Sequence, residues 1–161
     1  MQMRRKDREV SQIADIEEIL FNCKTCHFAM VDDGQPYVVP LSFGYEIVNE
    51  NVLVLYFHSA PEGRKVDVLK RNNRVCFEMA DEGEPIRSET PCNSGYYFSS
   101  VIGFGDAEFI TEADEKQKAL SILFKHQTGK DVGFTIEQAD SVCVFKVESS
   151  DFSGKKKPRE H

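Results

Sequence analysis

The sequence predicts one mainly β domain of the α+β class, an antiparallel barrel of about six strands with helices at its edges. Its 161 residues are enough for a single domain with one core. About six apolar stretches rich in β-branched and aromatic residues are joined mostly by short turns. The helical stretches do not alternate regularly with the strands, which disfavours a doubly wound sheet. We therefore treat residues 1–161 as one domain.

The first part of the chain predicts a helix followed by a hairpin. Ser11 can cap a helix that ends near residue 22, with one apolar stripe turned toward a sheet. Strands are expected over 25–31 and 36–47, joined by a tight turn at 32–34. Pro40 within the second strand indicates a bulge or a sheet edge.

The middle of the chain predicts two strands around a short helix. A strand over 52–58 is followed by a helix over 64–71 and a second strand over 74–80. Residues 81–94 are rich in acidic residues and proline with little periodicity, so we expect an exposed loop or lid there.

A long strand over 96–110 contains Gly103 and Gly105, where a sheet can bend to close a barrel. A helix over 112–126 and a last strand over 141–148 complete the predicted elements. At the two ends, residues 1–10 are expected to form a solvated arm and residues 153–161 a flexible tail.

Composition narrows the class of protein. The net charge of −7 disfavours a nucleic-acid partner, and no apolar run is long enough to span a membrane. The N-terminus lacks the apolar segment of a secretory signal, so a cytoplasmic location is expected. The five cysteines form an odd set that predicts thiols, and Cys23-Lys-Thr-Cys26 has no second ligand pair, so no metal site is expected.

The segment from His58 to Lys65 is the strongest functional signal. An apolar strand ends there, and Gly63, Arg64 and Lys65 begin a helix whose first turn has unpaired N–H groups and partial positive charge. Two cations there are disfavoured unless an anion joins them, and Ser59 adds a hydroxyl. The pattern predicts a phosphate site, while an ordinary solvated basic helix stays the alternative.

Four segments in this order carry a family resemblance: Met3-Arg-Arg-Lys-Asp-Arg8, Tyr37-Val-Val-Pro-Leu-Ser-Phe43, Tyr56-Phe-His-Ser-Ala60 with Gly63-Arg-Lys65, and Tyr97-Phe-Ser-Ser-Val-Ile-Gly-Phe-Gly105. The chain resembles the pyridoxamine 5'-phosphate oxidase-like, FMN-binding split β-barrel family, and its nitroimidazole-resistance branch most closely. The resemblance runs from about residue 3 to residue 154. It implies a six-stranded antiparallel split β-barrel with flanking helices.

The resemblance also implies a homodimer with two FMN sites at the subunit interface. In that case Ser59, Arg64 and Lys65 hold the FMN phosphate next to Gly63, and His58 with Ser59 borders the ribityl chain. The backbone of Val39, Pro40, Leu41 and Ser42 faces the flavin ring, and Ser99, Ser100 and Val101 of the partner subunit complete the pocket. FMN is favoured over FAD because one basic helix start can hold one monophosphate and no adenine-binding half is visible.

His58 has two possible roles. Its ordinary pKa near ~6.5 suits proton delivery beside a flavin, but a structural histidine that hydrogen-bonds the ribityl chain or the loop backbone is the favoured alternative.

The expected function is a flavin-dependent oxidoreductase that reduces nitro-aromatic or similar small oxidants. A nicotinamide donor would bind transiently at the flavin, or another protein would reduce it. One alternative is an FMN- or haem-binding sensor without turnover, with His27, His58 or His126 as the axial ligand. Others are a pyridoxamine phosphate oxidase-like enzyme, disfavoured because the chain lacks an arginine-rich C-terminal segment, and an empty barrel that serves as a structural dimer.

Overall fold

A computed structural model, which describes residues 3–157, contains one antiparallel sheet of eight strands. Seven strands follow the order β3-β2-β6-β7-β8-β5-β4, and the short β1 pairs with β8. The strands are β1 (Glu9–Val10), β2 (Thr25–Asp32), β3 (Gln35–Ser42), β4 (Gly44–Val48), β5 (Val52–Ser59), β6 (Arg74–Ile86), β7 (Gly95–Phe109) and β8 (Cys143–Lys157).

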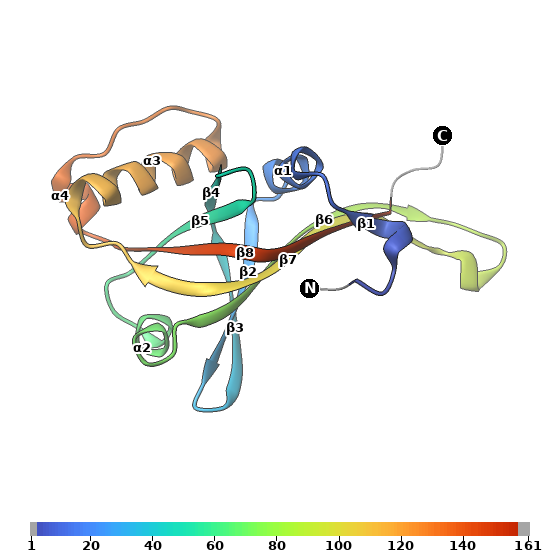
Figure 1. The fold of residues 1–161 in the computed structure, drawn as a ribbon, viewed down its shortest axis with the longest axis horizontal. Coiled ribbons are helices and arrows are strands. Elements are labelled where there is room, and N and C mark those ends of the chain that lie inside the picture. Colours follow the sequence, from blue (N-terminus) through green and yellow to red (C-terminus); the bar gives the residue numbers. More distant parts are fainter. Residues whose placement is uncertain (1–2, 158–161) are drawn as a thin grey trace.

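Helices cover parts of this sheet, and two hairpins extend beyond it (Figure 1). α3 and α4 lie together at one end of the sheet, while the β2–β3 and β6–β7 hairpins project from the body in different directions. The helices are α1 (Ile13–Asn22), α2 (Arg64–Arg71), α3 (Ala113–Thr128) and α4 (Ile136–Asp140), with 3-10 turns η1 (Lys6–Arg8) and η2 (Pro91–Asn93).

The main core lies between the curved sheet and α1, and phenylalanine rings form its centre. The ring of Phe28 lies edge-on to Phe57 at 4.9 Å and to Phe145 at 5.7 Å, and the last two rings stack at 5.3 Å. All three side chains are fully buried, and burying each contributes about 1.5–3 kcal/mol. A smaller cluster that includes Leu120 and Val144 joins α3 and α4 to the sheet.

The predicted α+β split-barrel class is confirmed, with two corrections. The sheet has eight strands, because a two-residue β1 is added and the predicted strand over 36–47 divides at Phe43 into β3 and β4. The end strands β3 and β4 are not paired with each other, so the expectation of a closed barrel is wrong. The register shift between Phe104 and Asp106 shows that β7 is irregular at Gly105 without closing the sheet.

Residues 81–94 are not simply a loop. β6 continues to Ile86 and pairs with the start of β7, as in Asp81 with Ser99 and Ile86 with Gly95. Residues 81–85 are exposed as expected, but 81–86 form a strand and not a loop, because β7 provides cross-strand hydrogen bonds that the local sequence pattern does not indicate.

Two predictions at element ends are also corrected. Gln12, rather than Ser11, is the N-cap of α1, and it makes no side-chain capping bond. Residues 153–157 are part of β8, where Lys155 pairs with Ser100 and with Glu9. The paired backbone explains why the predicted tail is a strand there, while residues 158–161 lie outside the described part of the chain.

Candidate functional site

The connection from β5 to α2 has a backbone shape that depends on glycine. Gly63, the residue before α2, has φ +132° and ψ 167°, a conformation that residues with a Cβ rarely adopt. A Cβ added at this position would meet nothing within 4 Å. Glycine is therefore needed for the conformation, and the space beside the backbone is open to a ligand.

Lys65, in the first turn of α2, is a partly buried cation without a carboxylate partner among the described residues. Burial lowers the pKa of its ammonium group, which means that its surroundings disfavour the charge. The positive end of the helix dipole disfavours it further. An anion at this helix start would stabilise the charged form of Lys65.

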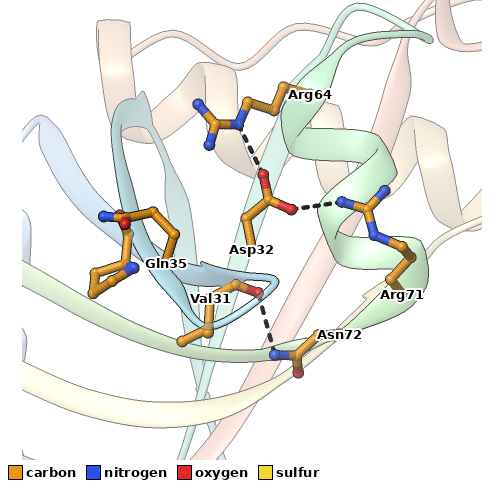
Figure 2. A network of polar contacts seen from close by, with 7 residues as sticks. Val31, Asp32, Gln35, Arg64, Arg71 and Asn72 are labelled. Atoms are coloured by element: carbon orange, nitrogen blue, oxygen red, sulfur yellow. Dashed lines mark hydrogen bonds and ion pairs between the residues drawn. The ribbon is translucent and has the colours of Figure 1, made fainter.

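Arg64 is held by the β2–β3 hairpin, as Figure 2 shows. Its Nε donates to Oδ2 of Asp32 at 2.9 Å, and its guanidinium lies 4.3 Å from the centre of the Tyr37 ring. Oδ1 of the same carboxylate accepts from Arg71 at 2.6 Å. No described residue hydrogen-bonds the two terminal nitrogens of Arg64. The guanidinium is therefore anchored by one edge, with donors still available for an anion.

His58 and Ser59 are adjacent at the end of β5, so their side chains project to opposite faces of the sheet. The hydroxyl of Ser59 donates to the Ala60 carbonyl at 2.9 Å, and Ser59 pairs across the sheet with Cys143. Burial raises the pKa of the Cys143 thiol, and its hydrogen bond with Ser59 opposes that rise.

His58 lines an apolar cavity of about 300 Å³ between β5 and the α3–α4 segment. Phe124 and Phe134, whose rings meet edge-on at 6.0 Å, form part of its wall. Burial, and after it the charge of Lys65, lower the pKa of His58. The imidazole is therefore neutral over more of the physiological pH range than an ordinary histidine.

The predicted ring-facing segment lies in β3, the strand at one end of the sheet, which confirms that Pro40 is at an edge. Val39 and Leu41 pack against the core, whereas Pro40 and Ser42 are exposed. Within the described chain, β3 pairs only with β2, so its other side offers backbone groups to a ligand.

Residues 99–101 lie in β7 between β6 and β8, apart from the β5–α2 connection. The side chain of Val101 is fully buried in the core of its own chain. Ser100 projects to the opposite face together with Ile102 and Phe104, which are both partly buried. Ser100 therefore shares a sheet face with Ile102 and Phe104, whereas Ser99 and Val101 point to the other face.

The structure thus places Ser59, Gly63, Arg64 and Lys65 in one connection, whereas the His58 side chain lines the cavity beside α3 and α4. Asp32 and Tyr37 were not identified from the sequence. An arginine at a helix start is disfavoured by the helix dipole, so the sequence could have predicted an acidic partner for Arg64. It could not have shown which acidic residue that partner is.

The other candidate ligand groups are engaged elsewhere. Nδ1 of His27 lies 2.7 Å from a Glu78 carboxylate oxygen, and Nε2 of His126 lies 2.8 Å from the Cys23 carbonyl. Cys23 and Cys26 are buried, and burial raises the pKa of both thiols. Within residues 3–157 no three His, Cys, Asp or Glu side chains gather as metal ligands, and no helix has the length and apolarity to cross a membrane.

Residues 12–156 match the family model described as pyridoxamine 5'-phosphate oxidase. Among solved structures, a candidate 5-nitroimidazole antibiotic resistance protein from Bacteroides thetaiotaomicron is 32% identical, with a TM-score of 0.79. That match covers 92% of this chain and 86% of the other. No curated protein matches the chain significantly.

More distant structures share the fold. The flavocytochrome Anf3 from Azotobacter vinelandii is 17% identical, with a TM-score of 0.80 over 98% of this chain and 73% of the other. An FAD-binding protein from Mesorhizobium loti is 24% identical, with a TM-score of 0.67 over 94% and 98% of the two chains. At these identities the likeness concerns the arrangement of the elements alone.

Proposed function

Because this chain belongs to the pyridoxamine 5'-phosphate oxidase family, we propose that it binds FMN and acts as a flavin-dependent oxidoreductase. The observation that carries the proposal is Lys65, a partly buried cation at a helix start without a carboxylate among the described residues. The open backbone at Gly63 and the free terminal nitrogens of Arg64 fit the same ligand, a phosphate monoester.

FMN fits these residues better than FAD. Arg64 and Lys65 provide two neighbouring cationic donors, and the Ser59 hydroxyl would join them by turning from the Ala60 carbonyl; this short set matches one monophosphate. FAD, which carries a second phosphate and an adenosine, is the natural competitor in a binding experiment. The expected order of affinity is FMN, then FAD, then riboflavin, since riboflavin has no phosphate for Lys65.

The ring of the flavin is proposed to lie along the free side of β3, at the backbone of residues 39–42. A second copy of the chain would cover it, which makes the protein a homodimer. The face of β7 that bears Ser100, Ile102 and Phe104 supports this, because partly buried apolar side chains there can pack against another subunit. Ser100 of the partner subunit would then complete the pocket.

The bound flavin would supply the electron transfer, and the protein would supply position and electrostatics. Lys65 and Arg64 would bind the phosphate, and Ser59 would offer its hydroxyl to the same end of the ligand. His58, kept neutral by its lowered pKa, could exchange a proton with a substrate, or it could serve only to order the connection.

The substrate class that we propose is a nitro-aromatic compound or a similar small oxidant. The relative from Bacteroides thetaiotaomicron, at 32% identity, supports this choice. A nicotinamide is the proposed electron donor and would bind only transiently, because residues 3–157 form a single antiparallel sheet without a dinucleotide-binding arrangement.

The first test combines an absorbance spectrum of the purified protein with thermal melts in the presence of FMN, FAD and riboflavin. A ligand at 100 times its Kd stabilises the native state by about 2.7 kcal/mol, so a saturable rise in melting temperature is expected with FMN. Lys65→Met should remove most of that rise. Lys70→Met, at the exposed other end of α2, is the matched control and should keep it.

Two results would contradict the proposal. A protein that shows neither flavin bands nor a melting shift would have no flavin site. A Soret band without flavin bands would favour the haem-binding alternative, and His58 would be the first ligand to test, because His27 and His126 already have polar partners.

A further inference from the structure

We propose that Asp32 is a positioning residue for the phosphate site: it holds Arg64 by one edge so that the terminal nitrogens of the guanidinium stay directed to the phosphate. This inference rests on the proposed function, and it adds a residue and a specific role to that site. It also assigns a role in cofactor selectivity to the β2–β3 hairpin, which lies far from α2 in the sequence.

The geometry fixes Arg64 on two sides. The carboxylate of Asp32 accepts from Nε at 2.9 Å (Figure 2). The guanidinium of Arg64 also packs against the Tyr37 ring, 4.3 Å from its centre. Because the contact uses Nε, it leaves both terminal nitrogens to pair with a second anion. A long side chain with one edge and one face held has already lost much of its rotamer freedom before the ligand arrives.

Asp32 is itself firmly held. Its side chain is only 16% exposed, whereas the side chains of Arg64 and Arg71 are 57% and 58% exposed. Oδ2 of Asp32 accepts from Arg64 and Oδ1 accepts from Arg71. These hydrogen bonds keep the pKa of Asp32 below its ordinary value. The carboxylate therefore stays ionised at neutral pH and forms a fixed anchor for the more exposed Arg64 side chain.

The same contacts join α2 to the hairpin at both helix ends. Arg64 is the first residue of α2 and Arg71 its last, and Asn72 donates to the Val31 carbonyl at 3.3 Å (Figure 2). The hairpin also includes β3, the strand proposed to face the flavin ring. Asp32 thereby fixes the phosphate-binding helix relative to the ring-facing strand.

The experiment compares the Kd of FMN with the Kd of riboflavin in Asp32→Asn. Loss of one ordering contact is expected to weaken FMN binding by about 3- to 10-fold. Riboflavin binding should not change, because it has no phosphate. Asp33→Asn is the matched control: it removes the same charge one residue away, Asp33 makes no ion pair among the described residues, and asparagine tolerates its φ of +52°.

A second variant and a double mutant keep the test decisive. Tyr37→Leu should weaken FMN binding in the same direction, even if Asp32→Asn proves unstable. In an Arg64→Ala background, Asp32→Asn should have no further effect on FMN affinity, since the group that it positions is gone.

Three outcomes separate the explanations. Tighter FMN binding in Asp32→Asn would mean that the carboxylate competes with the phosphate for Arg64. Unchanged binding would mean that the carboxylate does not position Arg64, and either result would overturn the inference. Equal weakening of FMN and riboflavin would also overturn it, because it would reflect general loosening of the hairpin. If the unaltered protein binds neither flavin, the proposed function itself fails.

Discussion

Two neighbouring cations at the start of α2 have different surroundings. Arg64 has Asp32 as a counter-ion and is largely exposed, while Lys65 is partly buried with no carboxylate partner among the described residues. Adjacent residues of the same charge would therefore not contribute equally to the proposed phosphate site. Lys65 has more to gain from a bound phosphate, and Arg64 is the better oriented of the two.

His58 provides a prediction about turnover. If it moves a proton during the reaction, His58→Ala should retain FMN and slow turnover by about 10²- to 10⁴-fold. The measurement is steady-state reduction of a nitro-aromatic compound, with flavin content determined in parallel. His27→Ala, at an exposed histidine paired with Glu78, is the control and should keep its rate. Unchanged turnover in His58→Ala would leave the histidine a purely structural role.

His126 provides a prediction about pH and stability. Its ring lies against Phe43 and Tyr45, and burial lowers the pKa of the imidazole, an effect to which Lys24 adds. The folded state therefore disfavours the protonated form. As the pH falls below about 6.5, the unfolded chain binds the proton more readily, so the free energy of unfolding should decrease.

The melting temperature is measured between about pH 7.5 and about pH 5, in steps of about half a pH unit. His126→Gln keeps a donor that can reach the Cys23 carbonyl but cannot titrate, so its melting temperature should fall less steeply over this range. An identical slope in the two proteins would show that other groups cause the acid sensitivity.

At the scale of the element, α2 begins where the backbone requires glycine. Gly63→Ala forces a Cβ into a conformation with φ +132° and should lower the free energy of unfolding by about 1–3 kcal/mol. Gly133→Ala is the control, because φ is not positive there and a Cβ would meet nothing within 4 Å; its effect should stay within about 0.5 kcal/mol. Denaturant unfolding of both variants checks the difference, and equal effects would remove the conformational argument.

The two projecting hairpins show how pairing overrides local pattern. β6 runs to Ile86 through an acidic stretch that contains Pro85, because β7 lies beside it and pairs with it. In the other hairpin, Asp33 and Gly34 both have positive φ, which is typical of a tight two-residue turn. The turn was predictable from two residues, whereas the length of β6 depended on its pairing with β7, the next strand in the chain.

At the scale of the whole molecule, the site is proposed to need two subunits. If Lys65 from one subunit and Ser100 from the other line the same pocket, Lys65→Met and Ser100→Trp should each remove most of the FMN binding on their own. Mixing the two variants under conditions that exchange subunits should restore binding at about one quarter of all sites, because half the dimers are mixed and each has one intact site.

Flavin fluorescence after mixing measures this restoration, and light scattering gives the mass of the unaltered protein as an independent check. Mixing Lys65→Met with itself is the control and should restore nothing. A monomeric mass, or no recovery with a confirmed mixed dimer, would contradict the shared site.

The sequence by itself determined the class of fold, the start of α2 and the cluster from Ser59 to Lys65, because these depend on neighbouring residues: apolar periodicity, a glycine and two cations in one turn. Only the tertiary structure decided that Asp32, 32 residues before Arg64, holds that arginine, and that the sheet stays open with β8 continuing to Lys157. Contacts of this kind depend on which segments the folded chain brings together. For β8 the free energy comes from pairing across the sheet, and for Arg64 it comes from an ion pair between segments distant in sequence; no local pattern encodes either.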